Sequence, residues 1–270
     1  MTTVDPLLLD SVTDASAQAR GRVMVSGSHG GLYAAYLAAR SGARAVILND
    51  AGRGLEDAGI TGVIALERVG MAAAAAAHDS CRIGDAGDAM AHGTISACNA
   101  LAASLGVKIG LSVAHASELL AAAPEPCGVM PEITETRRVI QPDGVALKLV
   151  LADSASLVRR QDAGRIVITG SHGGLIGSDP KRALKAAAAL GVFNDAGYAC
   201  GEAGTLRLPA LDARGIAALT VSYSSARIGD AMSAWESGVI SCVNRSARDA
   251  GCEIGESLAA AIRRLASIER

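Results

Sequence analysis

Residues 27–31 of the chain read Gly-Ser-His-Gly-Gly, and residues 170–174 repeat these letters without a change. An apolar run precedes the motif in both places, and an Ala- and Leu-rich run follows it. This pattern predicts a buried strand that enters a glycine-rich turn, from which a helix begins. A motif that occurs twice also indicates an internal repeat, which makes the spacing of other shared motifs informative.

Three further motifs recur in the same order, 143 to 145 residues apart: Asp-Ser at 10–11 and 153–154, Asn-Asp-Ala-Gly at 49–52 and 194–197, and Arg-Ile-Gly-Asp-Ala at 82–86 and 227–231. Residues 82–106 and 227–251, aligned without a gap, are identical at 12 of 25 positions. The sequence therefore predicts a tandem duplication with pseudo-twofold symmetry.

The composition is that of a folded protein rather than of a disordered or nucleic-acid-binding one. Half of the 270 residues are apolar and 19% are charged, which suits one large domain or two of ordinary size. The net charge is −2, there is no Lys- or Arg-rich run, and aromatic residues make up only 2%. Nucleic-acid binding needs a basic face and aromatic groups that stack on bases, so we exclude that partner.

We expect a cytoplasmic protein with no membrane partner. The N-terminus lacks the basic residues and apolar core of a secretory signal. The uncharged stretches 23–39 and 89–107 contain glycines and polar residues, so we interpret them as buried elements rather than membrane spans. The six cysteines form no C-x-x-C pair and predict buried, reduced thiols. The low charge and high apolar fraction favour a homo-oligomer.

Each predicted repeat alternates four strands with helices, which indicates a parallel sheet. In the first repeat, strands are expected at 7–9, 22–26, 45–48 and 72–77, and helices at 32–40, 55–69 and 86–105. The alanine run at 72–77 favours helix by propensity, but its partner at 216–222 has the pattern of a strand.

Two architectures satisfy this order of elements. The first is an α/β fold in which each repeat forms a four-stranded, Rossmann-like parallel sheet, with a repeat at 1–122, a linker with a hairpin at 123–150 and a repeat at 151–270. The alternative is a single (βα)8 barrel built from two half-barrels. The connection at 107–150 is long for a barrel, so we favour two open sheets.

Ligands bind at the carboxyl ends of parallel strands in both architectures, and every motif kept in both repeats is expected there. The glycine-rich turn and the helix behind it suit a carboxylate, a phosphate or a developing oxyanion. Ser, His and Asp beside such a turn are the usual parts of amide or ester hydrolysis. The predicted catalytic residues are Ser28, His29, Asp50, Ser171, His172 and Asp195, and the predicted substrate-binding residues are Gly30, Gly31, Arg82, Gly173, Gly174 and Arg227.

Each role has a structural alternative. Ser28 could cap a helix, and His29 could serve only as a hydrogen-bonding neighbour of the site. Asp50 could orient His29, act as a base, or cap the next helix. Arg82 and Arg227 could form salt bridges instead of holding a carboxylate or phosphate, and Asp85 and Asp230 are better explained as helix caps. His78, His92 and His115 have no histidine counterpart in the other repeat and are treated as ordinary.

The preferred function is hydrolysis of an amide or ester in a small, polar, anionic metabolite, without a cofactor. Three alternatives stay open: an acid/base lyase or isomerase, a non-catalytic protein that binds a small anion, and a metal-dependent hydrolase. In the last, Asp10, His29, Asp50 and Asp85 would hold Zn²⁺ or Mn²⁺. The motifs identify no known family.

Overall fold

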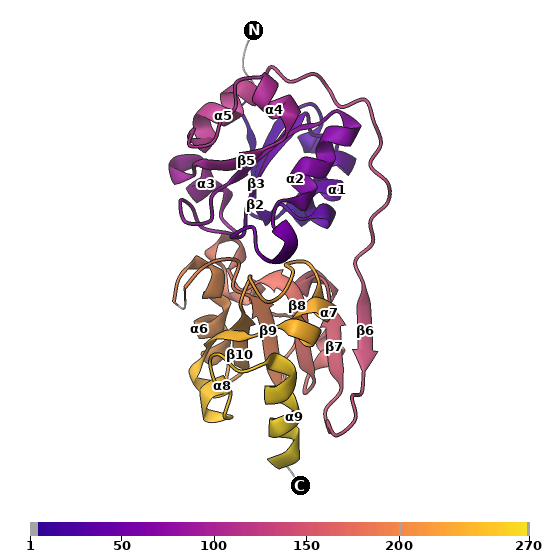
Figure 1. Ribbon diagram of the computed structural model, residues 1–270, viewed down its shortest axis with the longest axis vertical. Helices are drawn as coiled ribbons and strands as arrows, with labels where there is room; N and C mark the ends of the chain where they lie inside the picture. The colour runs from indigo at the N-terminus through magenta and orange to yellow at the C-terminus, as the bar shows by residue number, and fades with distance from the viewer. Residues whose placement is uncertain (1–4, 200, 269–270) are drawn as a thin grey trace. The chain divides into compact units, whose positions relative to one another are not determined.

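The computed structural model describes residues 5–199 and 201–268 and divides into two compact units (Figure 1). The first unit consists mainly of residues up to Thr134, and the second mainly of residues from Glu135 onwards. Each unit is an α/β structure with its own mixed, mostly parallel sheet.

The first unit has a five-stranded sheet in the order β1-β2-β3-β4-β5. Its strands are β1 (Leu7–Leu9), β2 (Val23–His29), β3 (Ala45–Asn49), β4 (Ala72–Ala76) and β5 (Ile95–Cys98). Neighbours from β1 to β4 are parallel, and β5 runs antiparallel to β4. The helices are α1 (Leu32–Arg40), α2 (Thr61–Ala65), α3 (Ala86–His92), α4 (Ala100–Ser104) and α5 (Val113–Leu120).

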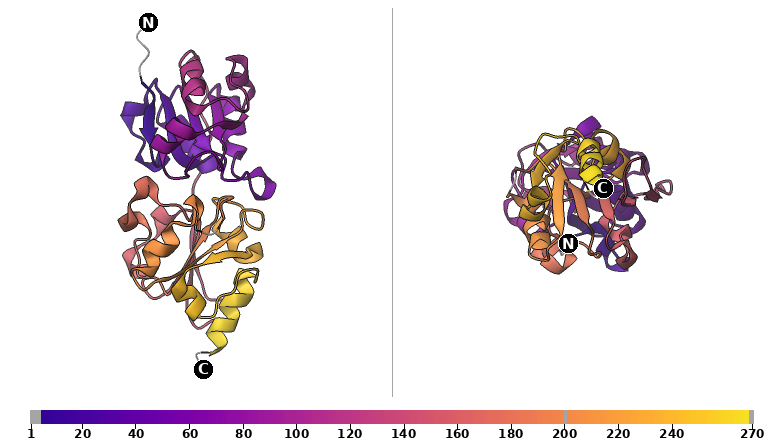
Figure 2. Two further views of the ribbon diagram at one scale, coloured as in Figure 1. Left: turned by 90° about the vertical axis from the view of Figure 1, so that its left-hand side faces the viewer. Right: turned by 90° about the horizontal axis from the view of Figure 1, so that it is seen from below.

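The two faces of this sheet pack into two separate hydrophobic layers, because successive residues of a strand face opposite sides. Met24, Val46 and Leu48 pack with residues of α1 and α2, whereas Val25 and Ile47 pack with residues of α3, α4 and α5. Helices therefore cover both faces, and Figures 1 and 2 show the sheet between them. The fully buried strands explain why alanine is tolerated throughout β4.

The second unit has a six-stranded sheet in the order β11-β10-β9-β8-β7-β6. Its strands are β6 (Arg137–Ile140), β7 (Leu149–Ala152), β8 (Ile166–His172), β9 (Leu190–Asn194), β10 (Ala217–Val221) and β11 (Ile240–Val243). The strands β7 to β10 are parallel, and the two outer strands β6 and β11 are antiparallel to their neighbours. The helices are α6 (Arg207–Asp212), α7 (Ala231–Ser237), α8 (Arg245–Asp249) and α9 (Leu258–Ile268).

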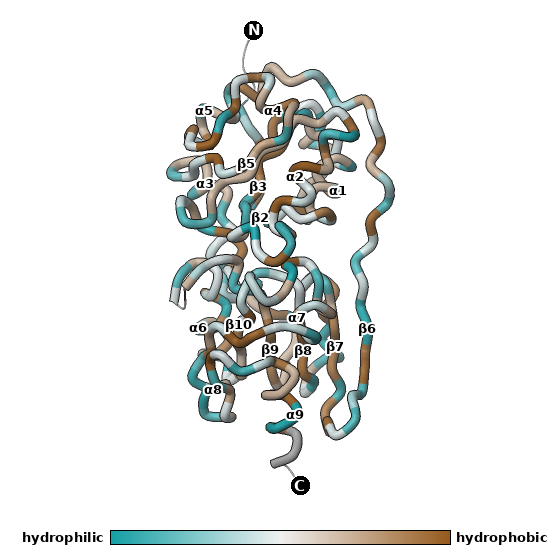
Figure 3. The backbone as a smooth tube through the Cα atoms, viewed as in Figure 1, coloured by the Kyte–Doolittle hydropathy of each residue, from teal (hydrophilic) through white to brown (hydrophobic). Residues whose placement is uncertain are grey.

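The core of the second unit is layered in the same way. Leu151, Ile168 and Val192 face α7, α8 and α9, whereas Val167 and Phe193 face α6 and the segment that precedes β9. Figure 3 shows the apolar character of β7 and β9 as brown tube.

Several expectations are corrected by these elements. The single barrel is wrong, because the strands form two separate sheets. The expected helix at 86–105 is interrupted: Gly93 ends α3, β5 then pairs with β4, and Asn99 begins α4 by accepting a hydrogen bond from the Ala102 N–H. The alanine-rich parts of 86–105 favour helix, but Gly93, Thr94 and Ile95 do not, and this middle part pairs with the outer edge of β4.

The second glycine-rich turn does not open an α-helix. Two short 3-10 turns, Ile176–Ser178 and Pro180–Arg182, take its place, with Gly177 at φ 59° and Ser178 at φ 55°. Positive φ values interrupt helical geometry, and Pro180 has no N–H to continue one.

The cysteines and the membrane prediction can be compared with the described part of the chain. Cys81 and Cys252 are free and buried, but Cys127 is free and exposed, and Cys242 is disulfide-bonded. The expectation of buried thiols throughout is therefore wrong; Cys200 lies outside the described residues. No helix in 5–199 or 201–268 has both the length and the apolar character that a membrane crossing requires.

Candidate active site at the carboxyl edge of the first sheet

Glycine is required at residue 27 because two other motifs press against it. A Cβ atom placed on Gly27 would lie 2.4 Å from the Asp85 nitrogen and 2.8 Å from the Asp10 carbonyl oxygen. The Gly84 N–H also donates to the Gly27 carbonyl at 2.8 Å. The glycine-rich turn, the Asp-Ser segment and the Arg-Ile-Gly-Asp turn of this unit therefore meet at one edge of the sheet.

The same packing occurs inside the second unit. A Cβ atom on Gly170 would lie 2.4 Å from the Asp230 nitrogen and 2.7 Å from the Asp153 carbonyl oxygen, and the Gly229 N–H donates to the Gly170 carbonyl at 2.8 Å. Glycine at these two positions is thus explained by close backbone approach rather than by ligand binding alone.

The hydroxyl groups of the two motif serines bind backbone N–H groups rather than a catalytic base. The Ser28 hydroxyl accepts the Val12 N–H at 2.9 Å, and the Ser171 hydroxyl accepts the Ala155 N–H at 2.9 Å. Among the residues that the structure describes, no hydrogen bond joins Ser28 to His29. This follows from strand geometry, because adjacent side chains of β2 point to opposite faces. A Ser-His relay within the first unit is therefore not formed.

His29 is held as a neutral imidazole. Its Nδ1 accepts the Gly31 N–H at 3.2 Å, which places the ring proton on Nε2. Burial lowers the pKa of His29 to about 4, so the ring stays uncharged at neutral pH. A neutral imidazole fixed in this way is a hydrogen-bond donor through Nε2, the role that suits polarising a carbonyl oxygen.

Glycine at residues 30 and 31 gives the turn its close packing. A Cβ atom on Gly31 would lie 2.8 Å from His29 Nδ1, and one on Gly30 would lie 2.6 Å from the Gly59 carbonyl oxygen. The Gly30 N–H donates to the Asn49 carbonyl at 2.8 Å. The N–H groups of both glycines are thus already engaged inside the protein, and His29 Nε2 is the donor that this turn presents.

The turn of the second unit repeats this arrangement. His172 is buried, its Nδ1 accepts the Gly174 N–H at 3.2 Å, and the Gly173 N–H donates to the Asn194 carbonyl at 2.8 Å.

Asp50 pairs with His78, a residue that the sequence did not single out. Asp50 Oδ1 accepts the Gly52 and His78 N–H groups at 2.9 Å each and lies 3.0 Å from His78 Nδ1. Burial raises the pKa of Asp50, but hydrogen bonds from His78, Ser96 and Gly52 lower it by more, so the net shift of the pKa is downward. An ionised Asp50 fixes the proton of His78 on Nδ1 and leaves Nε2 as an acceptor.

The position of His78 makes this pair accessible. The His78 side chain is 27% exposed, whereas that of Asp50 is 5% exposed. His78 follows β4 by two residues, and Asp50 follows β3 directly. The signal that could have identified His78 is this adjacency: a carboxylate and an imidazole at the carboxyl ends of neighbouring parallel strands.

The second unit lacks the imidazole at this position. Asp195 Oδ1 accepts the N–H groups of Gly197 at 3.1 Å and of Tyr223 at 2.9 Å. Tyr223 takes the place of His78, so a carboxylate-imidazole pair of this kind is found in the first unit.

The two predicted anion-binding arginines differ. Arg227 donates to Asp230 Oδ2 from Nη2 at 2.9 Å and from Nε at 3.2 Å, which is the structural salt bridge considered above. Arg82 is exposed, and its guanidinium has no hydrogen bond or ion pair with any residue that the structure describes. Arg82 is thus the better placed of the two to hold a negative charge.

The carboxylates of Asp10, Asp85 and Asp230 accept hydrogen bonds from backbone N–H groups. Asp85 caps α3 by accepting the Asp88 N–H at 2.9 Å, and Asp230 caps α7 by accepting the Ser233 N–H at 2.9 Å, as predicted. Asp10 accepts the Ala86 N–H at 3.0 Å. Within 5–199 and 201–268, no three His, Cys, Asp or Glu side chains group together so as to hold a metal. Asp10, His29, Asp50 and Asp85 are therefore not grouped as metal ligands in this part of the chain.

The sequence analysis also missed Arg207. Its side chain donates to the Gly174 carbonyl, as a helix N–H does to the equivalent carbonyl of the first unit. Arg207 is 2% exposed, and its Nε donates to the Gly174 carbonyl at 2.9 Å. In the first unit the corresponding Gly31 carbonyl accepts the Ala35 N–H of α1. Nη1 of Arg207 also reaches the Ala183 carbonyl at 2.6 Å. Burial lowers the pKa of Arg207 to about 10, which leaves it charged at neutral pH.

The combination of β2, β3 and β4 thus places His29, Asp50 and His78 at one sheet edge. His29 is the register partner of Asn49, and Asn49 is the partner of Ala76. Adjacent strands lie about 4.8 Å apart, so the strand ends carrying these residues span about 10 Å.

No protein-family model, curated protein or solved structure matches the chain.

Proposed function

We propose that the first unit is an enzyme that uses acid/base chemistry on a carbonyl group of a small, polar, anionic metabolite. The observation that carries this proposal is the pairing of buried Asp50 with partly exposed His78. A carboxylate behind Nδ1 stabilises the imidazolium that forms when Nε2 takes a proton, which makes His78 a general base.

The preferred reaction is hydrolysis of an amide or ester. His78 Nε2 takes a proton from water, and the hydroxide oxygen attacks the carbonyl carbon. The neutral His29 donates from Nε2 to the oxygen on which negative charge develops. The bond to the leaving group then breaks, and the proton returns from His78 to the leaving nitrogen or oxygen. Arg82 is the group that we assign to an anionic part of the substrate.

A second candidate, an isomerase or lyase, is favoured by one specific observation. The Ser28 hydroxyl accepts a backbone N–H and has no base beside it among the described residues, so the site offers no activated serine for acyl transfer. His78 could then remove a proton from the carbon next to a carbonyl while His29 stabilises the enolate.

One experiment separates these candidates. The protein is incubated in D2O with a panel of N-acetyl amino acids and dicarboxylic acid half-amides, and the products are followed by NMR. Hydrolysis releases the amine or ammonia; proton abstraction alone exchanges the α-hydrogen for deuterium without cleavage. Failure of every compound to react, together with saturable binding of one of them, supports the non-catalytic anion-binding alternative instead.

We also infer that the two units derive from a tandem duplication. The repeated motifs support this, and so do equivalent local contacts in the two units: the His29–Asn49 and His172–Asn194 register pairs, and the backbone groups packed against Gly27 and Gly170. On this account the first unit kept the catalytic pair, and the second unit replaced its histidine with Tyr223.

A further inference from the structure

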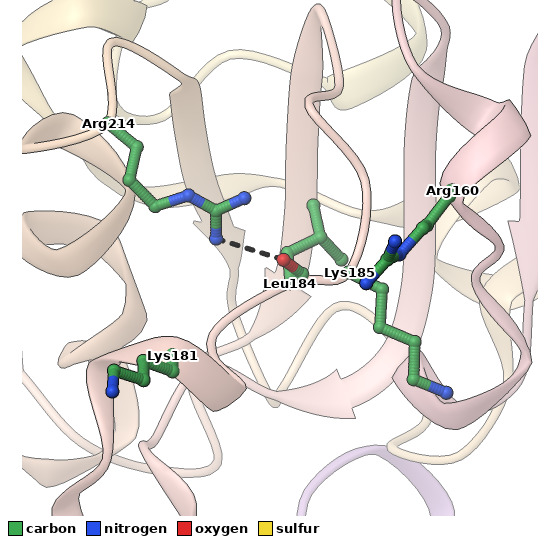
Figure 4. A pocket seen from close by; sticks show the side chains of 5 residues that line it. All are labelled: Arg160, Lys181, Leu184, Lys185 and Arg214. Atoms are coloured by element: carbon green, nitrogen blue, oxygen red, sulfur yellow. Dashed lines mark hydrogen bonds between the residues drawn. The ribbon is translucent and has the colours of Figure 1, made fainter.

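The second unit contains a cavity of about 400 Å³ whose lining is almost entirely cationic (Figure 4). The five lining residues are Arg160, Lys181, Leu184, Lys185 and Arg214. They come from the 3-10 turns Arg160–Asp162 and Pro180–Arg182, the segment before β9, and the turn after α6. Binding sites for small molecules have volumes of about 300 to 1,000 Å³, so this cavity is of adequate size.

Two of the cations are positioned by backbone carbonyl groups. Arg214 Nη1 donates to the Leu184 carbonyl at 2.9 Å, and Lys185 Nζ donates to the Ser156 carbonyl at 2.7 Å. Each uses one donor and keeps others, since a guanidinium has five N–H groups and an ammonium three. These two groups are therefore oriented but not saturated.

The other two cations have no partner in the described residues. Neither the Arg160 guanidinium nor the Lys181 ammonium makes a hydrogen bond or an ion pair with them, and no carboxylate lines the cavity. Figure 4 shows Lys181 and Arg214 on one side of Leu184, with Arg160 and Lys185 on the other. The four cationic residues are exposed and line one open pocket, and none of the lining residues supplies a counter-charge.

Two of the four cations have uncharged counterparts in the first unit. The positions 143 residues before Arg160 and Lys181 are Ala17 and Ala38. The cavity forms in the segment that has 3-10 turns where the first unit has α1. Four like charges repel one another, and the chain as a whole carries a net charge of −2. An anion in the cavity relieves that repulsion.

We propose that this cavity binds a small metabolite that carries two or more phosphate groups. Arginine binds phosphate oxygens through its planar fork and lysine binds them as a point charge, and both are present twice. No aromatic residue lines the cavity, so it offers no surface on which a nucleobase would stack. The site is independent of the chemistry that we assign to the first unit.

Calorimetric titration of the full chain with inorganic pyrophosphate, tripolyphosphate and orthophosphate tests this proposal. The test variant is the double substitution Arg160→Gln and Lys181→Gln. Its matched control is Lys148→Gln with Arg248→Gln, which removes two exposed charges of the same kinds from elsewhere in the second unit. Arg160 and Lys181 hold no other described group, and their removal lowers the repulsion among the cations, so the test variant is expected to melt at or above the wild-type temperature.

Pyrophosphate and tripolyphosphate are expected to bind with one-to-one stoichiometry and more tightly than orthophosphate. The test variant should weaken tripolyphosphate binding by roughly tenfold or more, since it removes two of the four cations that line the cavity. The control should bind as the wild type does. Three results would overturn the proposal: no binding at millimolar concentration, equal weakening in the control, or tighter binding of a single-stranded oligonucleotide than of tripolyphosphate.

Discussion

Asp50 Oδ1 lies 3.0 Å from His78 Nδ1, and the same oxygen accepts the His78 backbone N–H at 2.9 Å. Two contacts from one residue to one oxygen fix both the position and the tautomer of the imidazole. Substituting Asp50 with Asn keeps the shape but can reverse the tautomer, because the amide can donate as well as accept. We expect Asp50→Asn to lower kcat about 10²- to 10⁴-fold, with KM little changed, as measured by steady-state kinetics on a reactive compound of the panel.

The second unit provides the control for that substitution. Asp195→Asn alters the equivalent carboxylate, which accepts the Tyr223 N–H instead of facing an imidazole. Its effect on kcat should be small. A loss of activity as large as that of Asp50→Asn would contradict the assignment of catalysis to the first unit.

The neutral state of His29 predicts how stability depends on pH. Its pKa is lowered to about 4 in the folded protein and is about 6.5 when unfolded, so the unfolded state binds a proton first as the pH falls. The contribution of neutral His29 to stability is full above pH 6.5 and is lost as the pH falls towards 4. Urea unfolding from pH 7 to pH 4 should show a smaller decline for His29→Gln than for the wild type. His115→Gln, which changes an exposed imidazole, should behave as the wild type does.

Glu135 predicts a pH dependence of the opposite sense. Burial and the nearby charge of Asp153 raise the pKa of Glu135 to about 7, although a hydrogen bond from Ser154 partly opposes them. Its contribution to stability is full below its ordinary pKa of about 4.3 and is lost as the pH rises through 7. Glu135→Gln should therefore remove part of the decline in unfolding free energy between pH 5 and pH 8. An unchanged pH profile would show that Glu135 ionises normally.

Replacing Gly31 with alanine tests whether the turn positions His29. The new methyl group would lie 2.8 Å from Nδ1, so the ring must move and the Gly31 N–H loses its acceptor. We expect Gly31→Ala to destabilise the protein by about 1 to 3 kcal/mol and to shift the NMR signals of the His29 ring. Gly87→Ala is the matched control, because it adds a methyl to α3 with only the Asp85 carboxylate at 3.5 Å. That substitution should be neutral or stabilising.

Arg207 should be essential to the second unit. Arg207→Met removes the donors to the Gly174 and Ala183 carbonyl groups, which are buried. It also removes a guanidinium that lies 5.1 Å from the centre of the Phe193 ring. An unsatisfied buried acceptor costs about 1 to 3 kcal/mol, so denaturant unfolding should show a loss of about 3 kcal/mol or more. Arg248→Met, at an exposed position, should change stability by less than about 0.5 kcal/mol.

The strands that carry the site could be predicted from the sequence because their signals are local. The apolar run before each Gly-Ser-His-Gly-Gly motif marks β2 and β8, and the comparison with 216–222 identified the alanine run at 72–76 as β4 although alanine favours helix. The strand β5 was missed although the same comparison contains its signal. Its counterpart at 240–243 reads Ile-Ser-Cys-Val, which is β11, and both strands complete the hydrogen bonds along the neighbouring parallel strand.

The candidate site was predicted only in part, because its pairings depend on tertiary contacts. Asp50 and His29 lie at the edge where parallel strands end, as the motifs indicate. Their partners are 28 residues and two residues away in sequence: His78 faces Asp50, and the Gly31 N–H occupies His29 Nδ1. Arg207 likewise acts through backbone carbonyl groups, for which a single arginine in the sequence gives no signal.

The central claim is that His78 is the general base of the first unit. The most direct test is the rate of product release from a compound that the wild type converts, compared between His78→Gln and Tyr223→Phe, the equivalent position in the second unit. We expect a loss of about 10²-fold or more for His78→Gln and near-wild-type turnover for Tyr223→Phe. Wild-type turnover by His78→Gln would contradict it.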